Sequence, residues 1–211
     1  MKGRPAFPVV VAAPSGTGKT TVCRRVVEGD PEIDFSISHT TRPMRGSERD
    51  GVDYHFVSEA RFEELVGQDF FLEWAVYNGF RYGTSWQAID APLATGRDVL
   101  LEIEVQGARQ VRERRPDARL VFLLPPSFET LRERLSQRGT DSPEQIERRL
   151  EVAKRELAAI GDFDYAVVND DLERCVRDVA AILAAERRDE AAPLRRRFDP
   201  ARAGRGLRAG A

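Results

Sequence analysis

The sequence predicts an α/β protein in which a parallel sheet is covered by helices and interrupted by a smaller inserted sheet. Two observations lead to this prediction. Along most of the chain, short apolar runs rich in β-branched residues alternate with segments of Arg, Glu, Ala and Leu, which is typical of parallel strands with helical crossovers. In one stretch, short aromatic runs separated by Gly, Pro and Asp replace this alternation, which indicates a second sheet.

The main sheet begins with the apolar run 8–13, which predicts a buried strand, and a helical pattern follows from about Thr20 to Glu28. Three later apolar runs each precede a helix-like segment. These are Val99–Val105, Leu120–Leu124 and Tyr165–Val168. The inserted sheet is predicted from four short aromatic runs. These are Phe35–Ser38, Tyr54–Val57, Glu73–Tyr77 and Phe80–Tyr82.

A helical hairpin is predicted between the last two core strands. Gly139 is expected to end one helix, and Ser142-Pro143-Glu144-Gln145 begins another with a Ser N-cap, Pro at the first helical position and Gln completing a capping box. We expect this hairpin to act as a mobile lid. The organisation is therefore a core of residues 1–34, 86–131 and 155–190, an insert of residues 35–85, a lid of residues 132–154 and a tail of residues 191–211.

The tail consists mainly of Ala, Gly, Pro and Arg, and we find no hydrophobic periodicity in it. Such a segment buries too little apolar surface to offset its ordering entropy, so we expect it to be disordered. Its Arg195–Arg197 run is most simply a solvated tail, and a regulatory or nucleic-acid role for it stays open.

Composition excludes several classes of protein. The 211 residues carry a net charge of −2, which gives no electrostatic reason to expect a nucleic-acid or membrane partner. No segment has the length and apolar character of a signal peptide or a membrane span. The two cysteines, Cys23 and Cys175, cannot form a disulfide framework. We therefore expect a cytoplasmic protein, as a monomer or small homo-oligomer.

A glycine-rich motif lies where the first strand becomes the first helix. It has the spacing of a P-loop with Ala in place of the first Gly. Its residues are Ala13, Pro14, Ser15, Gly16, Thr17, Gly18, Lys19 and Thr20, and Thr21 follows. Lys19 is one of only three lysines in an Arg-rich chain. The motif predicts that backbone N–H groups bind phosphates, that Lys19 contacts the β- and γ-phosphates and that Thr20 binds Mg²⁺. The alternative is a glycine-rich turn with a solvent-facing lysine.

A second basic site is predicted in the insert, where Arg42 and Arg45 lie three residues apart in a turn interleaved with hydroxyl groups. The planar guanidinium of Arg binds phosphate oxygens in pairs and stays charged at any relevant pH, so this cluster suits a second phosphate. A solvated basic turn is the alternative.

Longer motifs resemble those of guanylate kinases. They are APSGTGKTT, SISHTTRPMRGSERDGVDYHFVS, FFLEW, YGTS, EIEVQGA, RGTDSPEQIERRL and VVND, in this order. The resemblance extends from about Val9 to Ala185. It implies a P-loop core with a five-stranded parallel sheet, a small mixed sheet that binds GMP and a helical lid. The implied activity is transfer of the γ-phosphoryl group of Mg-ATP to GMP, with ATP and GMP as partners.

The resemblance also implies roles for individual residues. The GMP phosphate would be bound by Ser38, Arg42, Arg45, Tyr54 and Tyr82, and guanine by Glu73, Thr84 and Glu104. The lid arginines that approach the ATP phosphates would be Arg138 and Arg149, with Arg134 nearby, and Asn169 would lie near adenine. Catalysis would then depend on Lys19, Arg42, Arg138 and Arg149.

The chemistry of guanine supports the role of Glu73. Guanine presents N1–H and the exocyclic amine as adjacent donors that one carboxylate can accept, whereas adenine would leave that carboxylate unpaired. Without the flanking motifs, Glu73 would be interpreted as a partly exposed strand acid, and the tyrosines as core aromatics.

Two substitutions depart from the family pattern. The chain has Glu102-Ile103-Glu104 where Asp-Ile-Asp is usual, and Thr84 replaces a frequent Ser. Strand alternation places both acids on one face, so we assign Glu102 to Mg²⁺ through a water molecule and Glu104 to the guanine amine.

Two rival functions stay open. One is a P-loop kinase with another phosphorylated acceptor, and the other is a guanylate-kinase-like module that binds protein partners without catalysis. The retained lysine and arginines argue against the second. His39 and His55 have no metal-ligand spacing and are predicted to be structural.

Overall fold

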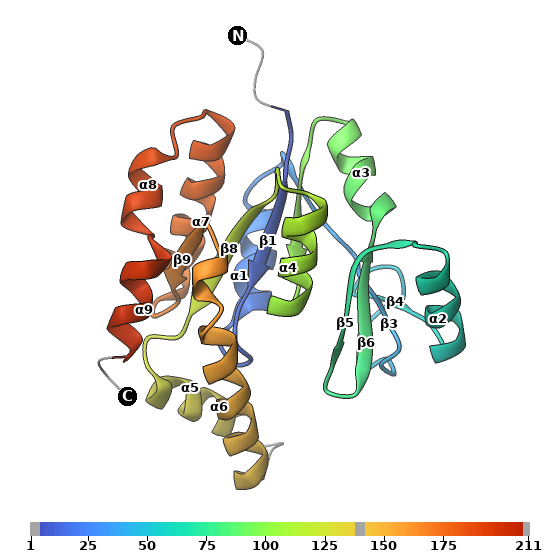
Figure 1. The fold of residues 1–211 in the computed structure, drawn as a ribbon, viewed down its shortest axis with the longest axis horizontal. Coiled ribbons are helices and arrows are strands. Elements are labelled where there is room, and N and C mark those ends of the chain that lie inside the picture. Colours follow the sequence, from blue (N-terminus) through green and yellow to red (C-terminus); the bar gives the residue numbers. More distant parts are fainter. Residues whose placement is uncertain (1–4, 138–141, 209–211) are drawn as a thin grey trace.

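A five-stranded parallel sheet forms the centre of the computed structural model, which describes residues 5–137 and 142–208 (Figure 1). The strand order is β2-β7-β1-β8-β9, and all neighbouring pairs are parallel. The strands are β1 (Pro8–Ala12), β2 (Ile33–Phe35), β7 (Asp98–Glu102), β8 (Arg119–Leu124) and β9 (Tyr165–Val168). The predicted α/β fold with a five-stranded parallel sheet is confirmed.

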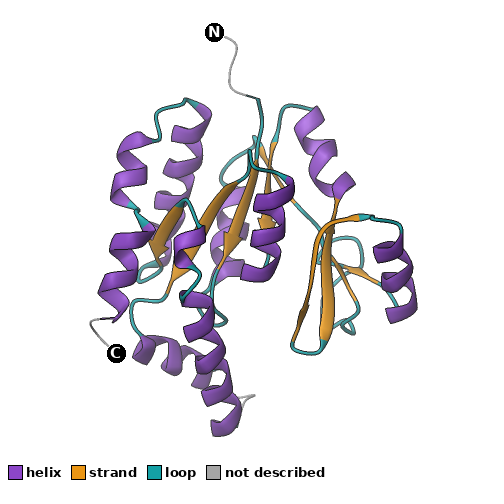
Figure 2. Ribbon diagram, in the orientation of Figure 1, coloured by secondary structure: helices purple, strands orange, loops and turns teal. Residues whose placement is uncertain are grey.

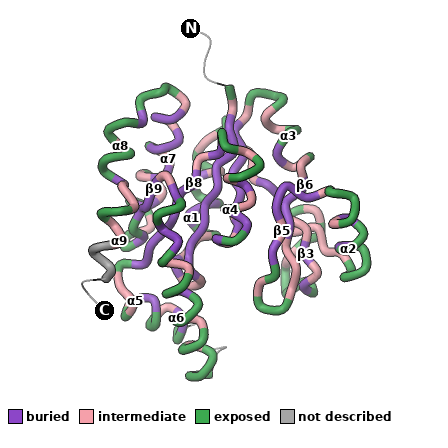
Figure 3. The backbone as a smooth tube through the Cα atoms, in the orientation of Figure 1, coloured by how far each residue is buried: buried purple, intermediate pink, exposed green. Residues whose placement is uncertain are grey.

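Each face of this sheet has its own apolar core, as the alternation of side chains along a strand requires. Val9 and Val11 of β1 pack with one set of helices, and Val10 and Ala12 pack with the other. The first set is α1 (Lys19–Glu28) and α7 (Leu172–Arg187), and the second is α3 (Trp86–Ala94) and α4 (Val105–Arg114). Figure 3 shows the core strands as the most continuously buried part of the chain.

The insert contains a four-stranded mixed sheet beside the core (Figure 2). Its order is β4-β3-β6-β5, with one parallel pair and two antiparallel pairs. The strands are β3 (His39–Thr40), β4 (His55–Phe56), β5 (Phe71–Tyr77) and β6 (Phe80–Ser85). The predicted second sheet is therefore present.

Two details of the insert differ from the sequence prediction. The run 35–38, predicted as a strand of the insert, does not form one. Phe35 ends β2 of the core sheet, residues 36–38 belong to no strand, and β3 starts at His39. A helix that was not predicted, α2 (Glu59–Gly67), follows β4; Ser58 caps it, and Phe62 and Leu65 pack on Phe71. The local signal for α2 is one capping serine and two apolar residues three apart, Phe62 and Leu65. Such a short pattern does not predict a helix between aromatic strands.

The strand predicted over 99–105 ends earlier, at Glu102, and Val105 begins α4. Ile103 and Glu104 nevertheless continue the extended path: Ile103 N–H donates to Val11 O at 3.3 Å, and Glu104 has φ −87° and ψ 163°. The alternation of the two acids is thus preserved beyond the end of the strand.

The predicted helical hairpin consists of α5 (Phe128–Ser136) and α6 (Pro143–Leu157), which extend away from the sheet (Figure 1). Ser142 and Gln145 form the predicted capping box at the start of α6. Gly139 and Arg138 lie outside the described residues. A short 3-10 helix, η1 (Ile160–Asp162), connects α6 to β9.

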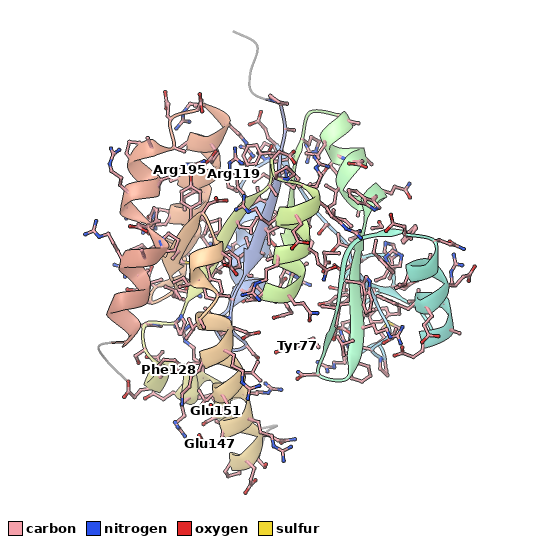
Figure 4. The ribbon with its side chains drawn as sticks, in the orientation of Figure 1. Tyr77, Arg119, Phe128, Glu147, Glu151 and Arg195 are labelled. Atoms are coloured by element: carbon pink, nitrogen blue, oxygen red, sulfur yellow. The ribbon has the colours of Figure 1, made fainter. Side chains whose placement is uncertain are left out.

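The prediction of a disordered tail is wrong for residues 191–208, which form α8 (Ala192–Arg197) and α9 (Pro200–Arg208). Phe198 is buried between them, and its carbonyl accepts from Ala166 N–H of the edge strand β9 at 2.8 Å. Arg195 pairs with the buried Glu186 at 2.6 Å, and Figure 4 shows Arg195 close to Arg119, a second partner of this carboxylate. Long-range contacts of this kind order a segment whose local sequence has no periodicity.

Within the described residues, no helix combines the length and the apolar character needed to cross a membrane.

Candidate active site

The glycine-rich loop, residues 13–20, connects β1 to α1 at the carboxyl edge of the core sheet. Gly16 and Gly18 both have φ 91°, a conformation that side chains other than Gly rarely adopt. Gly18 is also the N-cap of α1, which has no side-chain cap and no acidic residue in its first turn. The start of α1 therefore presents backbone N–H groups and the positive end of the helix dipole without a competing carboxylate.

Lys19 and Thr20 contact the two acids at the end of β7, Glu102 in the strand and Glu104 just after it. The Lys19 ammonium donates to Ile103 O at 2.8 Å and to Glu104 Oε1 at 3.1 Å, and the Thr20 hydroxyl donates to Glu102 Oε1 at 2.5 Å. Burial alone would lower the pKa of Lys19, but the carboxylates of Glu104 and Glu102 outweigh it and raise this pKa above its usual range. Lys19 is therefore charged at neutral pH.

The other side of the loop is fixed by two residues that were predicted near ATP. The Asn169 side chain, which is buried, donates to Thr17 O at 2.7 Å. Arg134 of α5 donates to Asn169 O at 3.0 Å and to Thr17 O at 3.3 Å. Both residues therefore lie against the glycine-rich loop.

Arg42 is the buried member of the basic turn, with 5% of its surface exposed. Its two terminal nitrogens donate to the two carboxylate oxygens of Glu48 at 2.7 and 3.0 Å, and its guanidinium lies 5.3 Å from the centre of the Tyr54 ring. Glu48 also accepts from Arg45 N–H at 2.8 Å. Glu48, which was not predicted from the sequence, therefore occupies both terminal nitrogens of the Arg42 guanidinium.

Glu73 is almost fully buried, with 3% of its surface exposed. It lies opposite Thr84 in the β5–β6 pairing, and the Thr84 hydroxyl donates to Glu73 Oε1 at 2.6 Å and lies 3.2 Å from Ser38 Oγ. Burial raises the pKa of Glu73 to about 7, and the Thr84 hydrogen bond offsets only part of this effect. The chain thus keeps an ionisable carboxyl in an apolar setting, which is typical of functional sites.

A single cavity joins these parts. It is lined by the glycine-rich loop, the insert and the acids at the end of β7: Ala13, Pro14, Ser15, Gly16, Gly18, Lys19, Thr20, Thr21, Ser38, Tyr54, Glu73, Ala75, Tyr77, Tyr82, Glu102, Ile103 and Glu104. A neighbouring cavity shares Thr20, Ser38, Tyr54 and Glu102 with it and adds Arg42 and Arg45. The start of α1 and the basic turn therefore lie at two adjoining cavities that share four lining residues.

Comparisons with known proteins agree with this geometry. The profile of the guanylate kinase family matches residues 6–186. The chain belongs to the guanylate kinase family. The guanylate kinase of Alkalilimnicola ehrlichii is 53% identical over 178 residues, covering 84% of this chain and 88% of that protein. The guanylate kinase of Thermus thermophilus is 53% identical over 188 residues, covering 89% and 84%. A crystal structure of guanylate kinase from Anaplasma phagocytophilum superposes with a TM-score of 0.73 at 30% identity, covering 86% of each chain.

The family resemblance drawn from the motifs is thus confirmed, and most of the residues it singled out lie around one space. Thr84, Arg134 and Asn169 contact Glu73 or the glycine-rich loop without lining either cavity. Arg149 lies half-buried on α6, whose residues do not line the cavity described above, and Arg138 lies outside the described residues.

Two further residues were not predicted from the sequence: Tyr77, which lines the cavity, and Glu156 of α6, which lies near Glu104. Tyr77 extends from β5 toward the core, where it interacts with Ser15 of the glycine-rich loop, and burial raises its pKa (Figure 4). Glu156, at the end of α6, has a pKa of about 7, raised by burial and by the nearby Glu104 carboxylate. A lone aromatic in a strand and a lone acid in a charged helix carry no local signal, so only the tertiary arrangement could reveal them.

The residues around Thr20 fit a magnesium ion. The Thr20 hydroxyl and the Glu102 carboxylate lie side by side next to the glycine-rich loop, and Mg²⁺ prefers such oxygen donors. Among residues 5–137 and 142–208, no group of three or more His, Cys, Asp or Glu side chains could bind a metal without further ligands.

Proposed function

We propose that this chain transfers the γ-phosphoryl group of Mg-ATP to GMP, and to dGMP, giving ADP and GDP, and thereby serves purine nucleotide metabolism and GMP recycling. The observation that carries the proposal is the shared cavity, in which the glycine-rich loop and the buried Glu73 line the same space. A donor phosphate at the loop and a guanine at Glu73 would then be held at one site.

On the acceptor side, guanine recognition is assigned to Glu73, Thr84 and Glu104. An ionised Glu73 accepts N1–H and the exocyclic amine, and the Thr84 hydroxyl orients this carboxylate. AMP would leave the buried carboxylate unpaired, which costs much of the binding free energy. The GMP phosphate is assigned to Ser38, Arg42, Arg45, Tyr54 and Tyr82, most of which line the adjoining cavities.

On the donor side, the P-loop from Ala13 to Thr21 would bind the ATP phosphates through backbone N–H groups and Lys19. Asn169 would lie near adenine, and Arg134 fixes the loop that carries it. Arg138 and Arg149 would approach the phosphates when the helical lid of residues 132–154 closes. Closure of this lid and of the insert would exclude water, which otherwise accepts the phosphoryl group.

Mg²⁺ would be held by Thr20, with Glu102 acting through a water molecule. When bound, it would neutralise negative charge on the phosphoryl group that is transferred.

The residues of the chain then act by alignment and charge. A phosphate monoester is already largely anionic near neutral pH, so the acceptor oxygen needs no general base. Lys19 must exchange the carboxylate of Glu104 for phosphate oxygens, and Arg42 must share or leave Glu48. With both substrates bound, Lys19, Arg42, Arg138 and Arg149 would surround a loose in-line transition state with positive charge.

We further propose a cytoplasmic location, because both cysteines are free and buried and would stay reduced there. Whether the chain is a monomer or a small homo-oligomer stays a prediction for a sizing measurement.

The proposal is tested by measuring ADP formation with Mg-ATP and equal concentrations of GMP, AMP, UMP or CMP. Turnover only with GMP or dGMP, abolished in Lys19→Ala, is the expected result. GMP binding without turnover would instead support a protein-interaction module. A preference for another monophosphate would mean that the longer acids at Glu102 and Glu104 have changed the acceptor pocket.

A further inference from the structure

Gly107 lies in the first turn of α4, where that helix packs on β5 of the insert. Its backbone is helical and its φ is not in the left-handed region, so the conformation itself does not require Gly. Ala would be the more favourable residue at such a position. The reason for Gly must therefore be sought in the space around it.

That space is occupied by the guanine-recognition carboxylate. A Cβ atom added to Gly107 would lie 2.3 Å from Glu73 Oε2, 3.0 Å from Glu73 Cδ and 3.3 Å from Ile103 Cδ1. The first distance is far inside van der Waals contact. We propose that Gly107 is a positioning residue for guanine specificity, because its missing side chain provides the space in which the Glu73 carboxylate lies.

The backbone on both sides of this contact is fixed. One turn after Gly107, the Gln110 side chain accepts from Trp74 N–H at 3.2 Å and donates to Trp74 O at 2.7 Å, which ties β5 to α4 beside Glu73. A methyl group at position 107 could not simply push the strand away. The flexible end of Glu73 would move instead and would lose its 2.6 Å hydrogen bond from Thr84.

Other glycines provide a contrast and a control. Gly83 is also crowded, but a Cβ there would meet Phe71 and Phe62, so its role is in core packing. Gly67, the last residue of α2, has nothing within 4 Å of an added Cβ. Gly67→Ala is therefore a matched Gly-to-Ala change on a helix, away from the cavity.

The inference rests on the proposed role of Glu73 and extends it to a residue that need not touch GMP. Misplacing a charged hydrogen-bonding group costs roughly 10- to 100-fold in affinity. We expect Gly107→Ala to raise the KM for GMP by that factor and to change the KM for ATP less than about two-fold. IMP lacks the exocyclic amine, so Gly107→Ala should raise the KM for IMP less than the KM for GMP. The preference of the enzyme for GMP over IMP should therefore fall.

The test is a double-mutant cycle of Gly107→Ala and Glu73→Gln, with Gly67→Ala as control, followed by KM and kcat for GMP, IMP and ATP. If Gly107 acts through Glu73, Gly107→Ala should raise the KM for GMP much less in the Glu73→Gln background than in the wild-type background. Equal losses in both backgrounds, or an unchanged KM for GMP in Gly107→Ala, would overturn the inference. If Glu73→Gln alone leaves the KM for GMP unchanged, the proposed role of Glu73 fails first.

Thermal unfolding separates this role from a structural one. Gly107→Ala should unfold at or above the wild-type temperature, because only the end of one side chain has to move. If the unfolding temperature falls, the clash must still be with Glu73, so Glu73→Ala should restore it in the double variant. A loss of stability that Glu73→Ala does not restore would contradict the proposal.

Discussion

Replacing Glu73 with Gln should stabilise this protein while weakening GMP binding, and the stabilisation should depend on pH. Glu73 is buried on the core side of β5, and burial raises its pKa from 4.5 to about 7. Ionisation of this carboxyl is therefore less favourable in the folded protein than in the unfolded chain. Gln has nearly the same shape, can accept the Thr84 hydrogen bond and never ionises.

The magnitude follows from the shift. At 1.36 kcal/mol per pKa unit, moving from 4.5 to about 7 corresponds to about 3 kcal/mol. Below pH 4.5 the carboxyl is neutral in both the folded and the unfolded state. Its contribution to the free energy of unfolding is then most favourable. This contribution is lost as the pH rises through about 7. The free energy of unfolding of Glu73→Gln should thus exceed that of the wild type by almost nothing below pH 4.5. The excess should grow to about 3 kcal/mol as the pH rises to about 7.

The assay is urea unfolding of both proteins across this pH window, with the denaturant slope compared to confirm that the unfolded states are alike. Glu113→Gln, an exposed change on α4, serves as a control. A difference between Glu73→Gln and the wild type that stays constant with pH would refute the reasoning. The same shift predicts that the wild-type KM for GMP rises as the pH falls below about 7, because a protonated carboxyl cannot accept both guanine donors.

Three further predictions concern other parts of the molecule. Phe198→Ala should lower the free energy of unfolding by about 2–4 kcal/mol, because the ring is buried against the core, whereas the exposed Arg196→Ala should have little effect. His39 has a pKa lowered to about 4 by burial and by His55, so stability should fall as the pH drops from 6.5 through about 4, and His39→Phe should flatten this dependence. Arg42→Lys should raise the KM for GMP roughly 10- to 100-fold, because Lys cannot form the paired contact that the guanidinium makes with Glu48.

Each of these has an outcome that would contradict it. An unchanged unfolding free energy in Phe198→Ala would mean that the C-terminal helices do not pack on the core in solution. A pH profile of stability that His39→Phe leaves intact would assign the acid sensitivity to other groups. An equal rise of the KM for ATP and for GMP in Arg42→Lys would indicate a general distortion of the site.

Local sequence patterns were sufficient for the core and for the phosphate loop. β1, the glycine-rich loop and α1 follow one another directly, so the apolar run, the spacing of the glycines and the helical pattern all indicate the same arrangement. The same holds for the capping box at Ser142, which is complete within four residues.

Features that depend on distant contacts were not predictable in this way. The C-terminal helices are ordered by Phe198 and by the pairing of Arg195 with Glu186, none of which forms a periodic pattern. Glu48 and Gly107 were visible in the motifs, but their roles depend on which side chains the fold brings against them. Tertiary packing, not local propensity, decides such positions.

The central claim is that one cavity brings a donor phosphate to GMP. The most direct measurement is to incubate the protein with Mg²⁺, GMP and ATP labelled on its γ-phosphate, and to separate the products. The account predicts that the label appears in the β-position of GDP, that little appears as inorganic phosphate, and that Lys19→Ala transfers none. Label that accumulates as inorganic phosphate with GMP present, or remains in ATP while GMP is bound, would contradict it.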